Sequence, residues 1–140
     1  MAPTAVPVGE DLRRTLAALA DVVLEEPGLP APSSVDVQGE LLDRTLADRP
    51  DLRAPLTDLL AAAAGKDPAA EVRRLQRDDP RAFIVLANVV AGAYYMHPDV
   101  KKIIGYPGQT PRYSEEDPAE EARLRELLRP VIERGAIYRR

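Results

Sequence analysis

Apolar residues recur along this chain at intervals of three and four, which is the spacing of one face of an α-helix. Leu12, Leu16, Leu19 and Val23 show this spacing near the start of the chain. No segment alternates between apolar and polar residues over the length of a strand, so we do not expect a sheet. The pattern predicts helices at residues 10–26, 35–48, 51–64, 68–77, 80–96, 98–104 and 118–134.

The helix predicted at 80–96 differs from the others because residues 82–90 are apolar nearly all round. Such a helix belongs at the centre of a bundle, so we expect it to be the most buried one. Its apolar run is shorter than the ~20 residues of a membrane span and contains Asn88, so no membrane span is expected. The sequence therefore predicts an all-α fold: a single-domain helical bundle of about six or seven helices with a central apolar helix. That domain should cover residues 10–140, after a flexible N-terminus at residues 1–9.

Prolines mark several of the predicted helix starts. Asp67, Asp79 and Asp117 each precede a proline, which places an N-cap acceptor before a residue suited to the first helical position. His97 stands before a proline in the same way, and we expect it to be either a cap of the next helix or a packing residue.

The helix predicted at 118–134 carries an apolar stripe that we expect to pack into the core. Pro130 lacks a backbone N–H, so a kink or a break is expected near residue 129. The stripe consists of Leu124, Leu127, Leu128, Val131 and Ile132.

Composition and charge exclude several classes of function. The chain has 140 residues and no cysteine, which rules out disulfides, thiolate metal sites and cysteine nucleophiles. The net charge is −4, and acidic and basic residues are interleaved. Nucleic acid is not expected as the main partner, because phosphate binding requires a basic patch.

The candidate chemistry is sparse. His97 is the only histidine, and Ser33, Ser34 and Ser114 fall in predicted loops, so no hydrolytic triad is expected. One histidine without cysteine does not make a zinc site, and no glycine-rich phosphate loop is present. We therefore expect no catalytic residue, no cofactor-binding residue and no metal site in this chain.

Aromatic residues gather after the central helix and suggest a binding surface. Tyrosine combines a large apolar area with a polar tip, which suits protein interfaces. One interpretation is that these residues face a partner. The other is that the rings cap the core of the bundle. The candidate partner-binding residues are Tyr94, Tyr95, Tyr106, Pro107 and Tyr113.

The same region resembles the gluconate 2-dehydrogenase subunit 3 family. Members of that family have a helix that ends in aromatic residues and is followed by a Gly-Tyr-type turn. The segment 19–24, before a Pro- and Gly-rich link, also resembles the opening helix of the family, and the likeness runs in order over residues 12–112. The specific part of the resemblance consists of Tyr94-Tyr95, Pro98-Asp99-Val100 and Ile104-Gly105-Tyr106-Pro107-Gly108.

The resemblance implies a small subunit without a cofactor of its own. Its partner would be a large flavoprotein of the glucose-methanol-choline type, which binds FAD and oxidises a sugar or polyol hydroxyl. The small subunit would support the folding, solubility or export of that partner in a hetero-oligomer. Two alternatives stay open: a stand-alone helical interaction module for another partner, and a small enzyme that uses only tyrosines and carboxylates.

Localisation depends on how Arg13 and Arg14 are interpreted. Many members of the family are exported by a twin-arginine leader, and this pair stands before an apolar stretch. Asp21 interrupts that stretch, and the apolar spacing is helical, so the segment is interpreted as an amphipathic helix. We therefore expect a cytoplasmic protein with a cytoplasmic flavoenzyme partner acting on sugars or glycosides.

Overall fold

The computed structural model describes residues 8–110 and 118–135. The chain divides into two compact units, Met1–Pro107 and Gly108–Arg140. Every regular element in the described ranges is helical, and none of those residues forms a strand. The predicted all-α fold is therefore confirmed.

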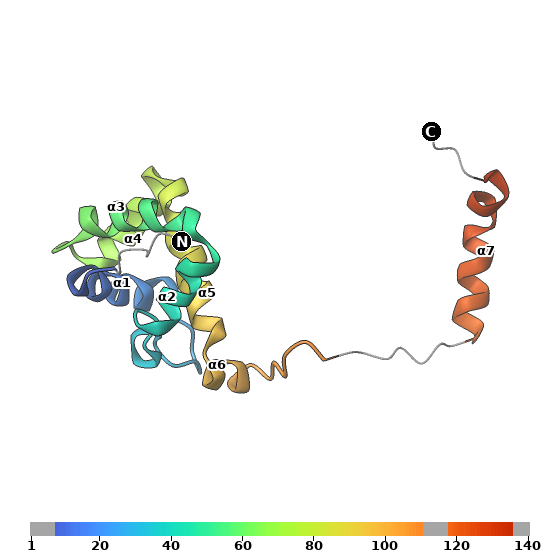
Figure 1. Cartoon of the computed structure of the whole chain (residues 1–140), viewed down its shortest axis with the longest axis horizontal. Helices are drawn as coiled ribbons and strands as arrows, with labels where there is room; N and C mark the ends of the chain where they lie inside the picture. Colours follow the sequence, from blue (N-terminus) through green and yellow to red (C-terminus); the bar gives the residue numbers. More distant parts are fainter. Residues whose placement is uncertain (1–7, 111–117, 136–140) are drawn as a thin grey trace, which may run out of the picture. The chain divides into compact units, whose positions relative to one another are not determined.

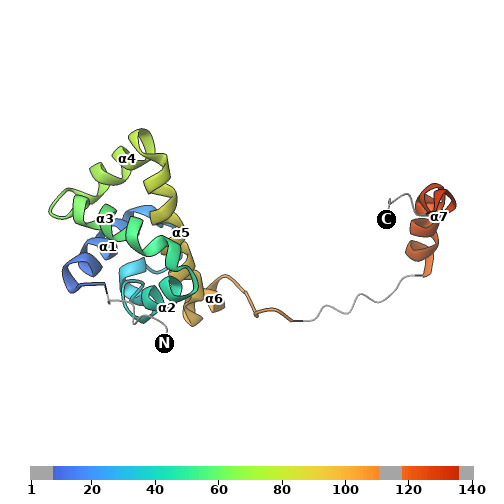
Figure 2. The same ribbon diagram turned by 45° about the horizontal axis from the view of Figure 1, so that its top comes forward.

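The first unit is a bundle in which short 3-10 turns join longer helices (Figures 1 and 2). Its elements are α1 (Glu10–Val23), η1 (Pro32–Val35), α2 (Glu40–Asp48), η2 (Pro50–Leu52), α3 (Arg53–Ala63), α4 (Pro68–Asp78), α5 (Pro80–Met96) and α6 (Pro98–Ile103).

Helix α5 is the central element of this unit, as its sequence predicts. It contacts α1, α2, α3, α4 and α6. It is not covered on every side, because Ile84 and Asn88 are exposed. Its buried face consists of Leu86, Val89, Val90, Ala93 and Tyr94.

The second helix begins later than its sequence pattern predicts. It was expected from residue 35, but α2 begins at Glu40 and is preceded by the 3-10 turn η1. Asp36 adopts the left-handed conformation, with a φ of 53°. A residue in that conformation cannot lie inside a right-handed helix, so the apolar spacing across it is misleading.

The predicted caps are present wherever the structure describes them. The side chains of Asp67 and Asp79 accept hydrogen bonds from backbone N–H groups three residues later, at 2.8 and 3.1 Å. The Nδ1 atom of His97 accepts the backbone N–H of Asp99 at 3.2 Å, which confirms its role as a cap. Asp117 lies outside the described residues.

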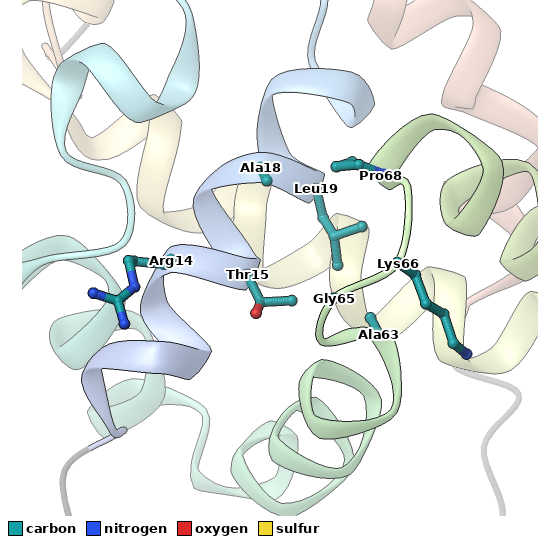
Figure 3. A pocket seen from close by; sticks show the side chains of 8 residues that line it. All are labelled: Arg14, Thr15, Ala18, Leu19, Ala63, Gly65, Lys66 and Pro68. Atoms are coloured by element: carbon teal, nitrogen blue, oxygen red, sulfur yellow. The ribbon is translucent and has the colours of Figure 1, made fainter.

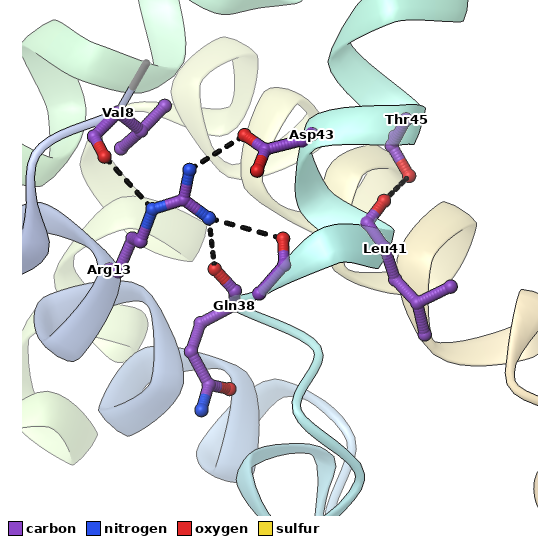
Figure 4. A network of polar contacts seen from close by, with 7 residues as sticks. Val8, Arg13, Gln38, Leu41, Asp43 and Thr45 are labelled. Atoms are coloured by element: carbon purple, nitrogen blue, oxygen red, sulfur yellow. Dashed lines mark hydrogen bonds and ion pairs between the residues drawn. The ribbon is translucent and has the colours of Figure 1, made fainter.

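Arg13 joins three parts of the first unit through its guanidinium group (Figure 4). Its Nε donates to the carbonyl oxygen of Val8 at 2.9 Å, and Nη1 donates to the carbonyl oxygens of Gln38 and Gly39 at 2.7 and 3.1 Å. Its Nη2 atom pairs with Asp43 Oδ1 at 2.6 Å. Arg13 is therefore a structural residue of α1, in agreement with the interpretation of this segment as an amphipathic helix.

Val8 lies within residues 1–9, where the sequence predicts a flexible N-terminus. The Val8 side chain is buried in the core cluster, and its carbonyl oxygen accepts the Arg13 hydrogen bond. Residues 1–7 lie outside the described ranges.

The second unit contains α7 (Pro118–Arg134). The helix continues through Pro130, so of the predicted kink or break the break is absent. The structure describes α7 by itself, so the prediction that its apolar stripe packs into the core stays a prediction. Helical spacing shows that a face needs cover but not what covers it. Between 43% and 68% of each of the following residues is exposed: Leu124, Leu127, Leu128, Val131 and Ile132.

Candidate functional site: an exposed surface at α6

Helix α6 ends in a turn that the backbone fixes. The backbone N–H of Tyr106 donates to the carbonyl oxygen of Lys101 at 2.8 Å, and that of Gly105 donates to Lys102 at 3.2 Å. Gly105 has a φ of 69°, which glycine adopts without a steric penalty. This pair of hydrogen bonds is the Schellman motif, which closes a helix and reverses the chain. Val100 is fully buried and anchors the helix to the core.

Beyond this anchor, large apolar side chains lie in solvent. The exposed fractions are 54% for Ile103, 47% for Ile104 and 47% for Tyr106. Next to them lies an open groove of about 500 Å³. We call these three residues and the groove the α6 surface; the groove is lined by Pro98, Lys101, Lys102, Gly105, Tyr106 and Pro107.

Tyr94 does not belong to this surface, although the sequence made it a candidate for partner binding. Only 1% of its side chain is exposed, and its hydroxyl donates to the carbonyl oxygen of Pro30 at 2.7 Å. Burial raises the pKa of the Tyr94 phenol, and the neighbouring Tyr95 raises it further. Tyr94 lies on the buried face of α5 and packs in the core.

The other aromatic candidates fall in different places. Tyr95 is exposed on the last turn of α5, and its ring meets that of Tyr94 edge-on, with 5.3 Å between the centroids. Tyr106 and Pro107 lie together in the groove. Tyr113 lies outside the described residues. The structure thus places Tyr106 and Pro107 together at the groove, and it pairs the rings of Tyr94 and Tyr95 at the end of α5.

Two further residues of the α6 surface were not selected from the sequence. Ile103 and Ile104 follow the buried Val100 at spacings of three and four, which normally indicates a shared buried face. Their exposure became visible only in the structure. The two residues before them, Lys101 and Lys102, were the available signal in the sequence. Two charged residues on so short a helix indicate that much of it is exposed.

A hollow of about 220 Å³ lies between α1 and the turn that joins α3 to α4 (Figure 3). Two cationic side chains, Arg14 and Lys66, border it and point away from each other. Each has an acidic partner elsewhere, because Arg14 pairs with Asp11 and Lys66 Nζ lies 3.7 Å from Glu71 Oε2. The hollow therefore does not present a pair of cations to an anionic ligand.

Glu71 is the one buried acidic residue in the described ranges, and its charge is compensated. Its carboxylate accepts hydrogen bonds from Arg74 Nε and Nη2 at 3.0 and 2.7 Å. These bonds lower the pKa of Glu71, and the nearby Lys66 contributes in the same direction. The group is thus held ionised as part of an ion pair rather than poised to exchange protons near neutral pH.

The described residues contain no group of three or more histidine, cysteine or acidic side chains arranged to hold a metal ion. Within residues 8–110 and 118–135, no helix has both the length and the hydropathy of a membrane span. No protein-family model, curated protein or solved structure matches this chain.

Proposed function

We propose that this chain is a non-catalytic small subunit that binds and stabilises a large FAD-dependent oxidoreductase acting on sugars, polyols or glycosides. The observation that supports the proposal is the α6 surface. It exposes apolar side chains on a fixed turn, and the turn lies within the residues that resemble the gluconate 2-dehydrogenase subunit 3 family. In this proposal FAD belongs to the partner, and the small subunit contributes no cofactor of its own.

The form of the α6 surface suits docking. The Schellman turn holds Tyr106 in place before any partner binds, which lowers the entropy lost on association. Lys101 and Lys102 border the groove, so a complementary partner surface would place acidic residues around an apolar centre. Arg13 bonds within the fold, which favours the interpretation of its segment as an amphipathic helix over a twin-arginine leader. We therefore test cytoplasmic flavoproteins as partners first.

The test is co-expression with each glucose-methanol-choline-type flavoprotein of the source genome, one at a time. A complex should elute as one species in size exclusion and carry the flavin absorption spectrum. If no flavoprotein co-elutes with the chain, the proposal is wrong. A complex formed only with a protein that lacks flavin would instead favour the stand-alone interaction module.

The Tyr106→Ala variant tests whether the α6 surface contacts the flavoprotein. A well-packed tyrosine at an interface is worth ~2 kcal/mol, so we expect affinity for the flavoprotein to fall by about tenfold to thirtyfold. The matched control is Ile84→Ala, which truncates an exposed apolar residue of α5. Met96 ends α5 next to the start of α6. Ile84 is about 18 Å away from Met96 along the axis of α5. Equal affinity of the Tyr106→Ala variant and the unmodified chain would remove the α6 surface from the interface.

A further inference from the structure

We infer that α7 is a second docking element, an amphipathic helix that fits an apolar groove on the same flavoprotein partner. The inference rests on the proposed function for the identity of the partner. It starts from the exposed residues Leu124, Leu127, Leu128, Val131 and Ile132, which we call the α7 face.

The width of the α7 face favours a groove over a second copy of this chain. At 100° per residue, its side chains spread over an arc of about 140° on the helix surface. Helices that pack against a globular protein show arcs wider than about 100°, whereas a coiled-coil seam is narrower. In the described residues 118–135 the face covers positions 124–132, while coiled coils sustain their pattern over about three heptads or more.

The charges of α7 disfavour a lipid surface as the occupant. Helices that lie on anionic membranes carry an excess of lysine and arginine on their polar side. Here four acidic residues balance four arginines, and Arg125 Nη2 pairs with Glu121 Oε1 at 2.7 Å. A protein groove with an apolar floor and a rim of mixed charge suits this helix better.

Chain length allows both elements to contact one large partner. Ten residues separate Pro107 from Pro118, and they can span at most about 35–40 Å when fully extended. A tether of this length raises the effective concentration of the second element once the first is bound. Loss of either contact should therefore weaken the complex without abolishing binding through the other.

The test uses the full chain with Leu128→Glu and Val131→Glu combined, which places two charges in the middle of the α7 face. We expect affinity for the flavoprotein to fall at least tenfold, while the thermal stability of the lone chain stays unchanged. The control is Ala122→Glu, an exposed position about half a turn away from Leu124 that receives one new carboxylate off the α7 face. Its affinity should stay within twofold of that of the unmodified chain.

Each other outcome overturns the inference in a recognisable way. Unchanged affinity of the double variant, with the unmodified chain still bound, removes α7 from the interface and leaves the proposed function standing. A lower melting temperature of the lone double variant would show that the face is covered within the chain. A dimer in sedimentation that the double variant dissociates would assign the face to a second copy. If no flavoprotein binds the unmodified chain, the proposed function fails and the inference falls with it.

Discussion

The hydroxyl group of Tyr94 provides the sharpest test of the fold, because one atom can be removed without disturbing the ring. The hydroxyl donates to the carbonyl oxygen of Pro30 at 2.7 Å and ties α5 to the connector before η1. Tyr94→Phe keeps the buried ring and its edge contact with Tyr95. The substitution therefore isolates the hydrogen bond.

The expected loss of stability includes the cost of the Pro30 carbonyl oxygen that the variant leaves without its donor. A net hydrogen bond of this kind contributes about 1 kcal/mol, and a partly buried acceptor without its donor raises the loss to about 1–2 kcal/mol. In a unit of about 100 residues each kcal/mol shifts the melting temperature by about 4–8 °C, so we expect a decrease of about 4–16 °C. The assay is thermal unfolding followed by circular dichroism at the helical band. Tyr106→Phe is the control, since it removes a hydroxyl from an exposed ring and should leave the melting temperature unchanged.

The same residue predicts a dependence on alkaline pH. Burial raises the pKa of Tyr94 above its ordinary value of 10.0, so the folded chain favours the neutral phenol. The stabilisation is present below that ordinary value and is lost as the pH rises through the higher pKa of the folded state. Tyr94→Phe should remove this part of the alkaline loss. If the variant melts like the unmodified chain at neutral pH and at pH 10–11, the burial and bonding of Tyr94 described above are wrong.

Two further changes test the packing and the charges of the first unit. Glu71→Gln should cost about 1 kcal/mol at neutral pH, because Arg74 loses a charged acceptor. The lowered pKa of Glu71 means that its stabilisation is present above its ordinary value of 4.5 and is lost as the pH falls through the folded value. In urea unfolding, the Glu71→Gln variant should lose less stability between pH 7 and pH 4 than the unmodified chain does. Glu133→Gln is the control at an exposed glutamate and should behave like the unmodified chain. Gly92→Val should cost about 1–3 kcal/mol in the same assay, since even a Cβ there lies 3.2 Å from Thr45 Cγ2 between α5 and α2. Unfolding midpoints equal to that of the unmodified chain would contradict the ion pair or the close approach of these helices, respectively.

Helix positions could be predicted from the sequence wherever a local interaction decides them. Helices α4, α5 and α6 begin at the predicted residues because an acceptor and a proline fix the backbone there. The start of α2 was missed because it depends on the left-handed Asp36. Aspartate adopts that conformation occasionally and as a single residue, and the spacing of apolar residues does not show where it does so.

The candidate site was predicted only in part, and α5 explains why. Tyr94 follows Leu86 and Val90 at helical spacing, so it shares their buried face, whereas Tyr95 is rotated by about 100° and is exposed. The sequence did not show which side of α5 faces the core, because apolar residues occupy nearly the whole circumference of that helix. A stretch without a polar side identifies a central helix, but it does not show which of two adjacent tyrosines faces the core.

The exposed faces at α6 and α7 have a common physical origin. The hydrophobic effect is non-directional, so an amphipathic pattern specifies that a face needs cover without specifying the cover. The surrounding charges carry the missing information, since they decide orientation and the choice of partner more than affinity. At α6, a complementary surface would place acidic groups opposite Lys101 and Lys102, around an apolar centre. At α7 the charges are balanced, so a complementary surface would have no excess of either charge. If one partner binds both faces, as we propose, it must therefore offer two chemically distinct sites.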